Sequence, residues 1–397
     1  MAPPPKDYWF HLKYWALIIP AAYVVSFIYS FGPVMGIGRK MVDYNVDTCE
    51  KISGPTDFNF CEDVVLSNVS GVAYTTCDPE RHLFNKVMGH HFLEEGQKAK
   101  SSDFWRVNYV EVPASIEKFT INKEFDSTSD FHPLGITFDI NPETNEQILA
   151  SVNLAHYGDA SIEFFTVDDE SLTLTHKRTV RDAKIYNPNS IHIINDVRLR
   201  ADDGTPSFFF TNDHYFTSGF LKKIENYFLY LSNVGFYNAR TGKVEKGING
   251  LLFANGITGT DEFLFVAETY AGTIKKYDIQ ITFVDDVPQV NLNYVKEAFF
   301  YMAVDNLRYV AEKDLVVVAG HPKGIDALIF MMVKDKVNAV KPPSQVDVWD
   351  VESGETKTLL VDNGELFTTS TTGLIDLVNS KLIVSSLFDE GLLICDL

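Results

Sequence analysis

Five short segments of the chain place glycine, asparagine or acidic residues directly before an apolar run. They recur at separations of roughly 50 to 70 residues, near the upper end of what one four-stranded propeller blade and its loops occupy. Carboxylate and carboxamide oxygens are the ligands that hard cations prefer, and glycine allows a close backbone approach. We therefore expect these corners to meet at one axis and to hold a hard cation; they are Glu62-Asp63, Gly135-Ile136, Asn189-Ser190, Asn255-Gly256 and Asp305-Asn306.

Each corner also has a simpler interpretation. An asparagine at a blade corner commonly makes a turn hydrogen bond, Glu62 and Asp63 together are typical of a surface acidic pair, and Asp305 of a turn cap. No single position decides between these interpretations. The prediction of a cation site depends on their joint placement at comparable corners.

The elements that must position these corners are predicted to be strands. From Phe131 onward, short apolar runs such as residues 162–167 and 315–319 are separated by turn formers such as Asp203-Gly204. A chain of 397 residues accommodates two ordinary domains or one closed all-β architecture. An aromatic content of 13% and few helical periodicities favour the second.

One helix is predicted at Phe220–Leu231, where apolar residues recur at i, i+3, i+7 and i+10. Lys222 and Lys223 lie on its other face. Such a helix packs its apolar stripe into the core or lies on a bilayer surface, and the sequence leaves both alternatives open.

Residues 14–38 are almost wholly apolar, with Lys6 and Lys13 before them and Arg39 and Lys40 after them. This run is long enough to span a bilayer and longer than the apolar region of a cleaved signal. It predicts an uncleaved transmembrane signal anchor. We expect a tail and anchor at residues 1–40 and the folded domain at residues 41–397.

The four cysteines contain no C-x-x-C pair, which leaves a zinc or thioredoxin-like motif without support. An even count behind an export segment predicts disulfides, Cys49 with Cys395 and Cys61 with Cys77, the alternative being four reduced, buried cysteines. Asn68 begins an N-V-S glycosylation sequon. The chain is thus expected in the secretory pathway, with a lumenal or extracellular body that is membrane-anchored or secreted.

The formal net charge of −20 argues against nucleic-acid binding, because phosphates would be repelled. The adjacent His90 and His91 are expected in a solvated loop rather than at a metal. The chain lacks the G-x-S-x-G motif, so a serine-hydrolase elbow has no support.

Seven segments in sequence resemble the paraoxonase/arylesterase family of calcium-dependent lactonases, over roughly residues 45 to 397. The resemblance implies a six-bladed β-propeller with calcium in its central tunnel, closed by a disulfide between the terminal segments. The segments are residues 61–63 (CED), 187–189 (NPN), 211–216 (TNDHYF), 253–257 (FANGI), 304–306 (VDN), 320–322 (GHP) and 393–397 (LICDL).

The resemblance also implies two calcium sites. At the second, structural site it places Asp63, the carbonyl of Ile136 and a further aspartate, which is Ser190 in this chain. Loss of a carboxylate weakens a hard-cation site, so weak or absent occupancy is expected there. The ligands implied for the catalytic calcium are Glu62, Asn189, Asn255, Asp305 and Asn306.

Leu134 stands where the family has a histidine, so the usual histidine dyad is absent. The histidine that completes this dyad is matched by His156, with a backbone-bonded blade-edge histidine as the equal alternative. His132 lies two residues from Leu134 and would share its side of an extended backbone, although a backbone-bonded blade-edge histidine is the simpler interpretation. Asp305 is therefore the favoured candidate for the catalytic base or nucleophile.

The leading hypothesis is calcium-dependent hydrolysis of a small lactone or aryl ester, with a metal-polarised carbonyl and a water activated by Asp305, by His156 or by the metal. One rival keeps the fold for isomerisation or cyclisation of a metabolite, because Leu134 makes one wall apolar. Another is a membrane-anchored binding propeller without turnover. Membrane contact is expected through the N-terminal segment and through Phe220–Leu231.

Overall fold

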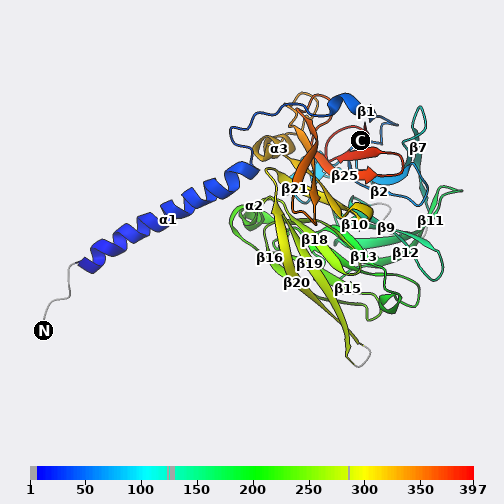
Figure 1. The fold of residues 1–397 in the computed structure, drawn as a ribbon, viewed down its shortest axis with the longest axis horizontal. Coiled ribbons are helices and arrows are strands. Elements are labelled where there is room, and N and C mark those ends of the chain that lie inside the picture. Colours follow the sequence, from blue (N-terminus) through cyan, green and yellow to red (C-terminus); the bar gives the residue numbers. More distant parts are fainter. Residues whose placement is uncertain (1–6, 123–124, 126–129, 285–286) are drawn as a thin grey trace.

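The computed structural model describes residues 7–122, 125, 130–284 and 287–397. Within them, five four-stranded sheets and one five-stranded sheet are arranged as the six blades of a propeller (Figure 1). The innermost strand of each blade contacts the innermost strand of the next, and the sixth contacts the first, which closes the ring. The predicted all-β, six-bladed propeller is therefore confirmed.

The blades follow one another along the chain. Of the four antiparallel strands of each blade, the inner strand comes first in every blade but the sixth, whose outer strand is β1 (Cys49–Ile52). The first blade has β2 (Cys61–Leu66), β3 (Val72–Cys77), β6 (Asp103–Asn108) and β7 (Ser115–Lys118). The second has β9 (Pro133–Ile140), β10 (Gln147–Asn153), β11 (Ser161–Asp168) and β12 (Thr173–Val180), and β8 (Thr120–Ile121) pairs in parallel with β12. The third has β13 (Pro188–Ile194), β14 (Ser207–Asn212), β15 (Ser232–Asn238) and β16 (Lys243–Leu251).

The fourth blade has β17 (Ala254–Gly259), β18 (Phe263–Glu268), β19 (Thr273–Val284) and β20 (Val287–Phe299). The fifth has β21 (Ala303–Val310), β22 (Leu315–His321), β23 (Ser344–Asp350) and β24 (Thr356–Asp362). The sixth has β25 (Ser370–Asp376), β26 (Lys381–Ser386), β27 (Leu392–Asp396) and, as its outer strand, β1 (Cys49–Ile52).

Side chains on the two faces of a strand join a blade to both of its neighbours. On β22, Val316 and Val318 pack with Phe265 of the fourth blade, whereas Val317 and Ala319 pack with residues of the sixth. Because successive side chains of a strand point to opposite faces, one continuous apolar run serves both interfaces. This explains why β22 begins with a continuous run of apolar residues.

The ring is closed by the two ends of the folded region. β1 pairs antiparallel with β27, and Cys49 lies opposite Cys395. The predicted disulfides Cys49–Cys395 and Cys61–Cys77 are both present, the second joining β2 to β3. The alternative of four reduced cysteines was wrong.

The helix α1 (Asp7–Val34) projects away from the propeller, and only its end is held by the body (Figure 1). Val34 and Met35 are buried against Phe253 and Tyr270, and Met35 O accepts a hydrogen bond from Ile325 N. A transmembrane segment was predicted at residues 14–38. Over the part of the chain that the structure describes, no helix combines the length and the apolar character needed to cross a membrane.

The predicted second helix is α2 (Gly219–Phe228). Lys222, expected on its outer face, is buried and donates from Nζ to Lys86 O at 2.9 Å. Phe220 is instead 75% exposed and Leu221 48% exposed. The alternative of a stripe packed wholly in the core is therefore wrong for Leu221.

Candidate functional site

All six inner strands carry an irregularity at the same point, close to the start of the strand. In each blade one extra residue on the inner strand interrupts its pairing with the second strand. Such β-bulges re-aim a side chain and are common next to active sites. The bulged positions are Glu62, Leu134-Gly135, Asn189-Ser190, Asn255-Gly256, Asp305-Asn306 and Thr371-Thr372.

Three of these bulges are preceded by a residue whose backbone is in the left-handed conformation. Phe60, Phe253 and Thr369 have φ of 58°, 56° and 53°, each two residues before its bulge. Non-glycine residues rarely adopt this conformation, and at functional sites the surrounding structure maintains it. The unusual backbone conformation at these three positions is thus part of how the bulged residues are positioned near the axis.

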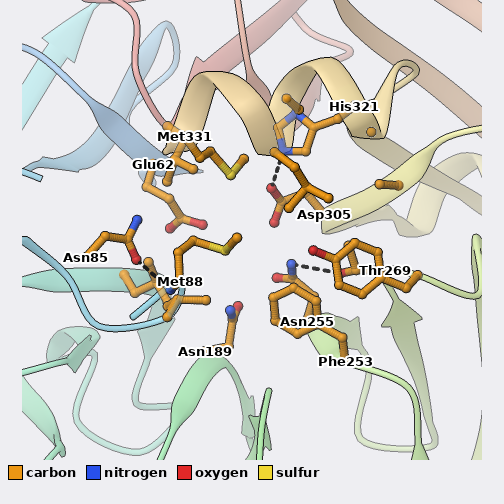
Figure 2. A pocket seen from close by; sticks show the side chains of 18 residues that line it. Glu62, Asn85, Met88, Asn189, Phe253, Asn255, Thr269, Asp305, His321 and Met331 are labelled. Atoms are coloured by element: carbon orange, nitrogen blue, oxygen red, sulfur yellow. Dashed lines mark hydrogen bonds and ion pairs between the residues drawn. The ribbon is translucent and has the colours of Figure 1, made fainter. Parts of the chain in front are cut away.

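The bulged side chains meet in one pocket. Figure 2 shows Glu62, Asn189, Asn255 and Asp305 pointing from four different blades into a cavity of about 60 Å³. Glu62, Asn189 and Asn255 are buried almost completely. The corners that the sequence predicted at one axis do lie around one axis.

The three asparagines are oriented by hydrogen bonds from their amide nitrogens. Asn255 Nδ2 donates to Thr269 Oγ1 at 3.0 Å, and Asn306 Nδ2 donates to Glu62 Oε1 at 2.8 Å. Asn189 Nδ2 donates to Asp213 Oδ2 at 3.3 Å. Because every NH₂ group is engaged in this way, the carbonyl oxygens are left free.

Four buried oxygens at this site have no hydrogen-bond partner among the residues that the structure describes: Glu62 Oε2, Asn189 Oδ1, Asn255 Oδ1 and Asn306 Oδ1. Buried polar atoms nearly always have partners, so four together require an explanation. A hard cation that takes six to eight oxygen ligands would supply it. The donor set therefore fits calcium.

The raised pKa of Glu62 also favours a cation at this site. Burial raises the pKa of the Glu62 carboxyl, and the neighbouring carboxylates of Asp63 and Asp305 raise that pKa further. A carboxylate pair without a counterion is costly in a buried site. A divalent cation would offset this repulsion.

Two acid–histidine pairs lie at the ligand set. Asp213 Oδ1 lies 2.5 Å from His214 Nδ1, so an Asp–His pair supports the amide of Asn189. His321 Nε2 lies 3.2 Å from Asp305 Oδ2. His214 and His321 are both buried.

His132 and His156 lie together, but outside the pocket. Their rings stack with centroids 3.3 Å apart, and His156 also stacks on Phe84. Leu134 lines both the central pocket and the small cavity that contains the two histidines. An apolar side chain therefore separates the histidines from the candidate cation site.

Among the described residues, Asp78, His132 and His156 are the group whose ligating atoms lie within 4.8 Å of one another. Face-to-face stacking directs the ring nitrogens along parallel planes rather than toward one point. Burial, with smaller contributions from His132, Lys86 and Arg81, lowers the pKa of His156 to about 3. Cationic neighbours disfavour a metal ion here.

The residues predicted for a second cation have a different arrangement. Asp63 pairs with Arg308, and Ile136 donates its N–H to Asp63 Oδ2 at 2.8 Å. Ser190 Oγ is buried and lacks a hydrogen-bond partner. Arg308 was not recognised as relevant from the sequence.

A hairpin and a helix line the mouth of the pocket. The hairpin is β4 (Phe84–Asn85) with β5 (His90–His91), so the prediction of a solvated loop at the two histidines was wrong. His90 Nδ1 lies 3.1 Å from Met331 O in α3 (Gly324–Met331). Apolar side chains from these elements border the ligands: Val87, Met88, Ala327, Leu328 and Met331.

The sequon residue Asn68 lies exposed in the turn between β2 and β3. Its position leaves room for a glycan, and modification there stays a prediction.

The chain is similar to known proteins over most of its length. The model of the family described as arylesterase matches residues 93–397. Bovine (Bos taurus) serum paraoxonase/arylesterase 2 is 26% identical over 287 residues, covering 71% of this chain and 73% of the relative. Human (Homo sapiens) serum paraoxonase/arylesterase 1 is 28% identical over 290 residues, with the same coverage of 71% and 73%.

Among solved structures, a periplasmic gluconolactonase of Pseudomonas aeruginosa aligns with a TM-score of 0.42 and 10% identity, over 81% of this chain and 77% of that one.

Proposed function

Because the chain belongs to the arylesterase family, we propose that it hydrolyses lactones and aryl esters with a calcium ion held in the central pocket. The observation that carries this proposal is the set of four unpartnered, buried oxygens on Glu62, Asn189, Asn255 and Asn306. With Asp305, they are the residues that would hold the ion. When bound, calcium would polarise the ester carbonyl and stabilise the developing negative charge.

Asp305 is the residue proposed to take a proton from the attacking water. Its carboxylate lines the pocket, and His321 Nε2, 3.2 Å from Oδ2, would keep it oriented. Water adds to the carbonyl carbon, the C–O bond to the leaving oxygen breaks, and the proton held by Asp305 passes to that oxygen. A lactone gives one hydroxy acid, and an aryl ester gives an acid and a phenol. The apolar side chains of Met88, Leu328 and Met331 would receive the hydrocarbon part of the substrate and exclude bulk water.

The direct test is turnover of a lactone panel and phenyl acetate by the purified full-length protein, before and after chelation. Activity should vanish with the chelator and return with calcium but not with magnesium, which demands a stricter geometry. Asp305→Asn should lower kcat by roughly 10²–10⁴-fold. Asp326→Asn is the control, because Asp326 lies on α3, pairs with Lys323 and is not part of the proposed ligand set. Undiminished turnover in Asp305→Asn would remove the proposed role.

A second candidate function keeps the ion but not the hydrolysis. Leu134, rather than a histidine, forms one wall of the pocket, and neither His132 nor His156 reaches it. This supports isomerisation or cyclisation of a metabolite carbonyl as the alternative. Product analysis in ¹⁸O-labelled water separates the two, because only hydrolysis incorporates the label. A purely binding propeller would show neither product.

We also propose that the protein enters the secretory pathway and sits on a membrane through the helices beside the pocket mouth. The disulfides support the first part. Exposed apolar side chains on all three helices, such as Leu17, Phe220 and Ile329, support the second. Flotation with liposomes should be lost when residues 1–30 are deleted together with Phe220→Ser, and persistence of flotation would contradict the proposal.

A further inference from the structure

The second cation position expected at Asp63, Ile136 and Ser190 does not fit an ion in this chain. Asp63 accepts four hydrogen bonds: Oδ1 from Val64 N at 2.9 Å, from Thr372 Oγ1 at 2.7 Å and from Arg308 Nη2 at 2.5 Å, and Oδ2 from Ile136 N at 2.8 Å. A carboxylate offers about four lone-pair sites. Those of Asp63 are used by the protein itself.

Arg308 is placed as a cation would be. Its Nη2 donates to the carbonyl of Ile136 at 3.3 Å as well as to Asp63, and its Nε donates to Val64 O at 3.0 Å. Its Nη1 donates to Leu307 O at 2.9 Å. One guanidinium on β21 thus binds the oxygens that line this position on β2 and β9.

The charge balance agrees with this placement. One buried carboxylate faces one guanidinium, so the position is neutral without a metal. Ser190 contributes a neutral hydroxyl at this position. A carboxylate in its place would bring the negative charge to two, which a divalent ion would balance. The contrast is with the central pocket, where four oxygens lack partners.

We propose that the side chain of Arg308 replaces the second metal ion, as a permanent cation that joins the first, second and fifth blades at the axis. The chain then binds one calcium, and the cohesion of these blades does not depend on a metal. The count of one ion rests on the function proposed above. The role of Arg308 does not.

The test uses a Glu62→Gln background, in which the central site is disabled, so that any remaining calcium effect reports on the second position. Arg308→Gln in that background should lower Tm by roughly 5–10 °C, because Asp63 is left buried without a counterion. Millimolar calcium should restore part of this loss, since removing the guanidinium frees the oxygens of Asp63 and Ile136. Arg308→Lys is the matched control: it keeps a charge and should show little response to calcium.

Three results would overturn the proposal. They are an unchanged Tm in the Arg308→Gln variant, no recovery of that Tm on addition of calcium, or two calcium ions bound to the unmodified protein by isothermal titration calorimetry. A count of zero ions in the unmodified protein, with calcium recovery intact in the double variant, would instead remove the proposed function and leave the role of Arg308 standing.

Discussion

At the scale of single residues, the central pocket is defined by which way its amides face. Thr269 and Asp213 contribute no atom to the proposed ligand set, yet they engage the nitrogens of Asn255 and Asn189. An amide that turned over would present two N–H donors to a cation. Partners that orient a ligand are therefore as necessary as the ligand itself.

Thr269→Val should weaken calcium binding by roughly 10–100-fold, because the valine offers no acceptor for Asn255 Nδ2. The measurement is a calcium titration followed by enzyme activity or by calorimetry, and the midpoint is expected at a higher calcium concentration in the variant. Thr269→Ser keeps the hydroxyl and serves as the control. Equal midpoints for the valine and serine variants would show that Asn255 is held by other means.

The stability of the protein should fall as the pH falls from about 6.5 toward 3. Burial lowers the pKa of His156 to about 3, so across this window the unfolded chain binds a proton that the folded protein does not. The contribution of this group reaches at most about 1.4 kcal/mol per pH unit. His156→Gln should flatten the slope of unfolding free energy against pH, measured by urea denaturation.

The matched control for that measurement is His91→Gln, because His91 is exposed on the neighbouring hairpin. His192, whose pKa burial lowers to about 4, will leave a residual slope in the His156 variant. A slope identical to that of the unmodified protein would show that His156 does not carry this dependence.

At the scale of elements, the inner strands position the ligands through their bulges. The second bulged residue of the fourth blade is Gly256, and an added Cβ there would lie 2.6 Å from Asn306 Cα and 2.7 Å from Asp305 O. The neighbouring backbone is therefore close enough that only glycine fits. Two ligand-bearing strands approach each other at this point.

Gly256→Ala should lower the free energy of unfolding by about 1–3 kcal/mol through overpacking. It should also reduce activity, because relief of the contact displaces Asp305 and Asn306. Gly158→Ala is the control: its nearest atom, Ala155 Cβ, would lie at 3.6 Å. Guanidinium unfolding of both variants gives the comparison, and equal stabilities would contradict the close-packing argument.

Much of the candidate site could be predicted from the sequence, because acidic or amide residues recur at the corners of four blades and the family resemblance assigns them as ligands. Asn189, Asn255 and Asp305 stand at corresponding corners, and periodicity reveals such corners. Arg308 was missed, since an arginine two residues beyond a ligand looks like an ordinary strand residue facing solvent. Its partners lie on strands more than 170 positions away in the chain, and no local pattern encodes that distance.

Elements that depend on long-range contacts were also the least predictable. The short hairpin at His90 is held against α3, and buried Lys222 donates a hydrogen bond to the carbonyl of Lys86 in the same hairpin region. Local secondary-structure propensity does not predict either contact. The blades themselves were foreseeable, because a strand buried on both faces needs a continuous apolar run.

At the scale of the whole molecule, the disulfide Cys49–Cys395 fastens the two ends of the ring across a separation of 346 residues. Replacing both cysteines by serine should lower the free energy of unfolding by about 2–5 kcal/mol, since a long loop loses most chain entropy when closed. The Cys61–Cys77 pair, separated by 16 residues, should cost less when replaced in the same way. Denaturant titration of both double variants checks the order, and a larger loss at the short loop would contradict it.

The outer strand of the last blade is made first, and this has a consequence for biosynthesis. Strand β1 leaves the ribosome before the strands of any blade, and its partner β27 follows all of them. Five blades are therefore able to assemble during translation, while the sixth waits for β27. Until β27 is made, Cys49 is a thiol without its partner Cys395, beside an open edge of the ring.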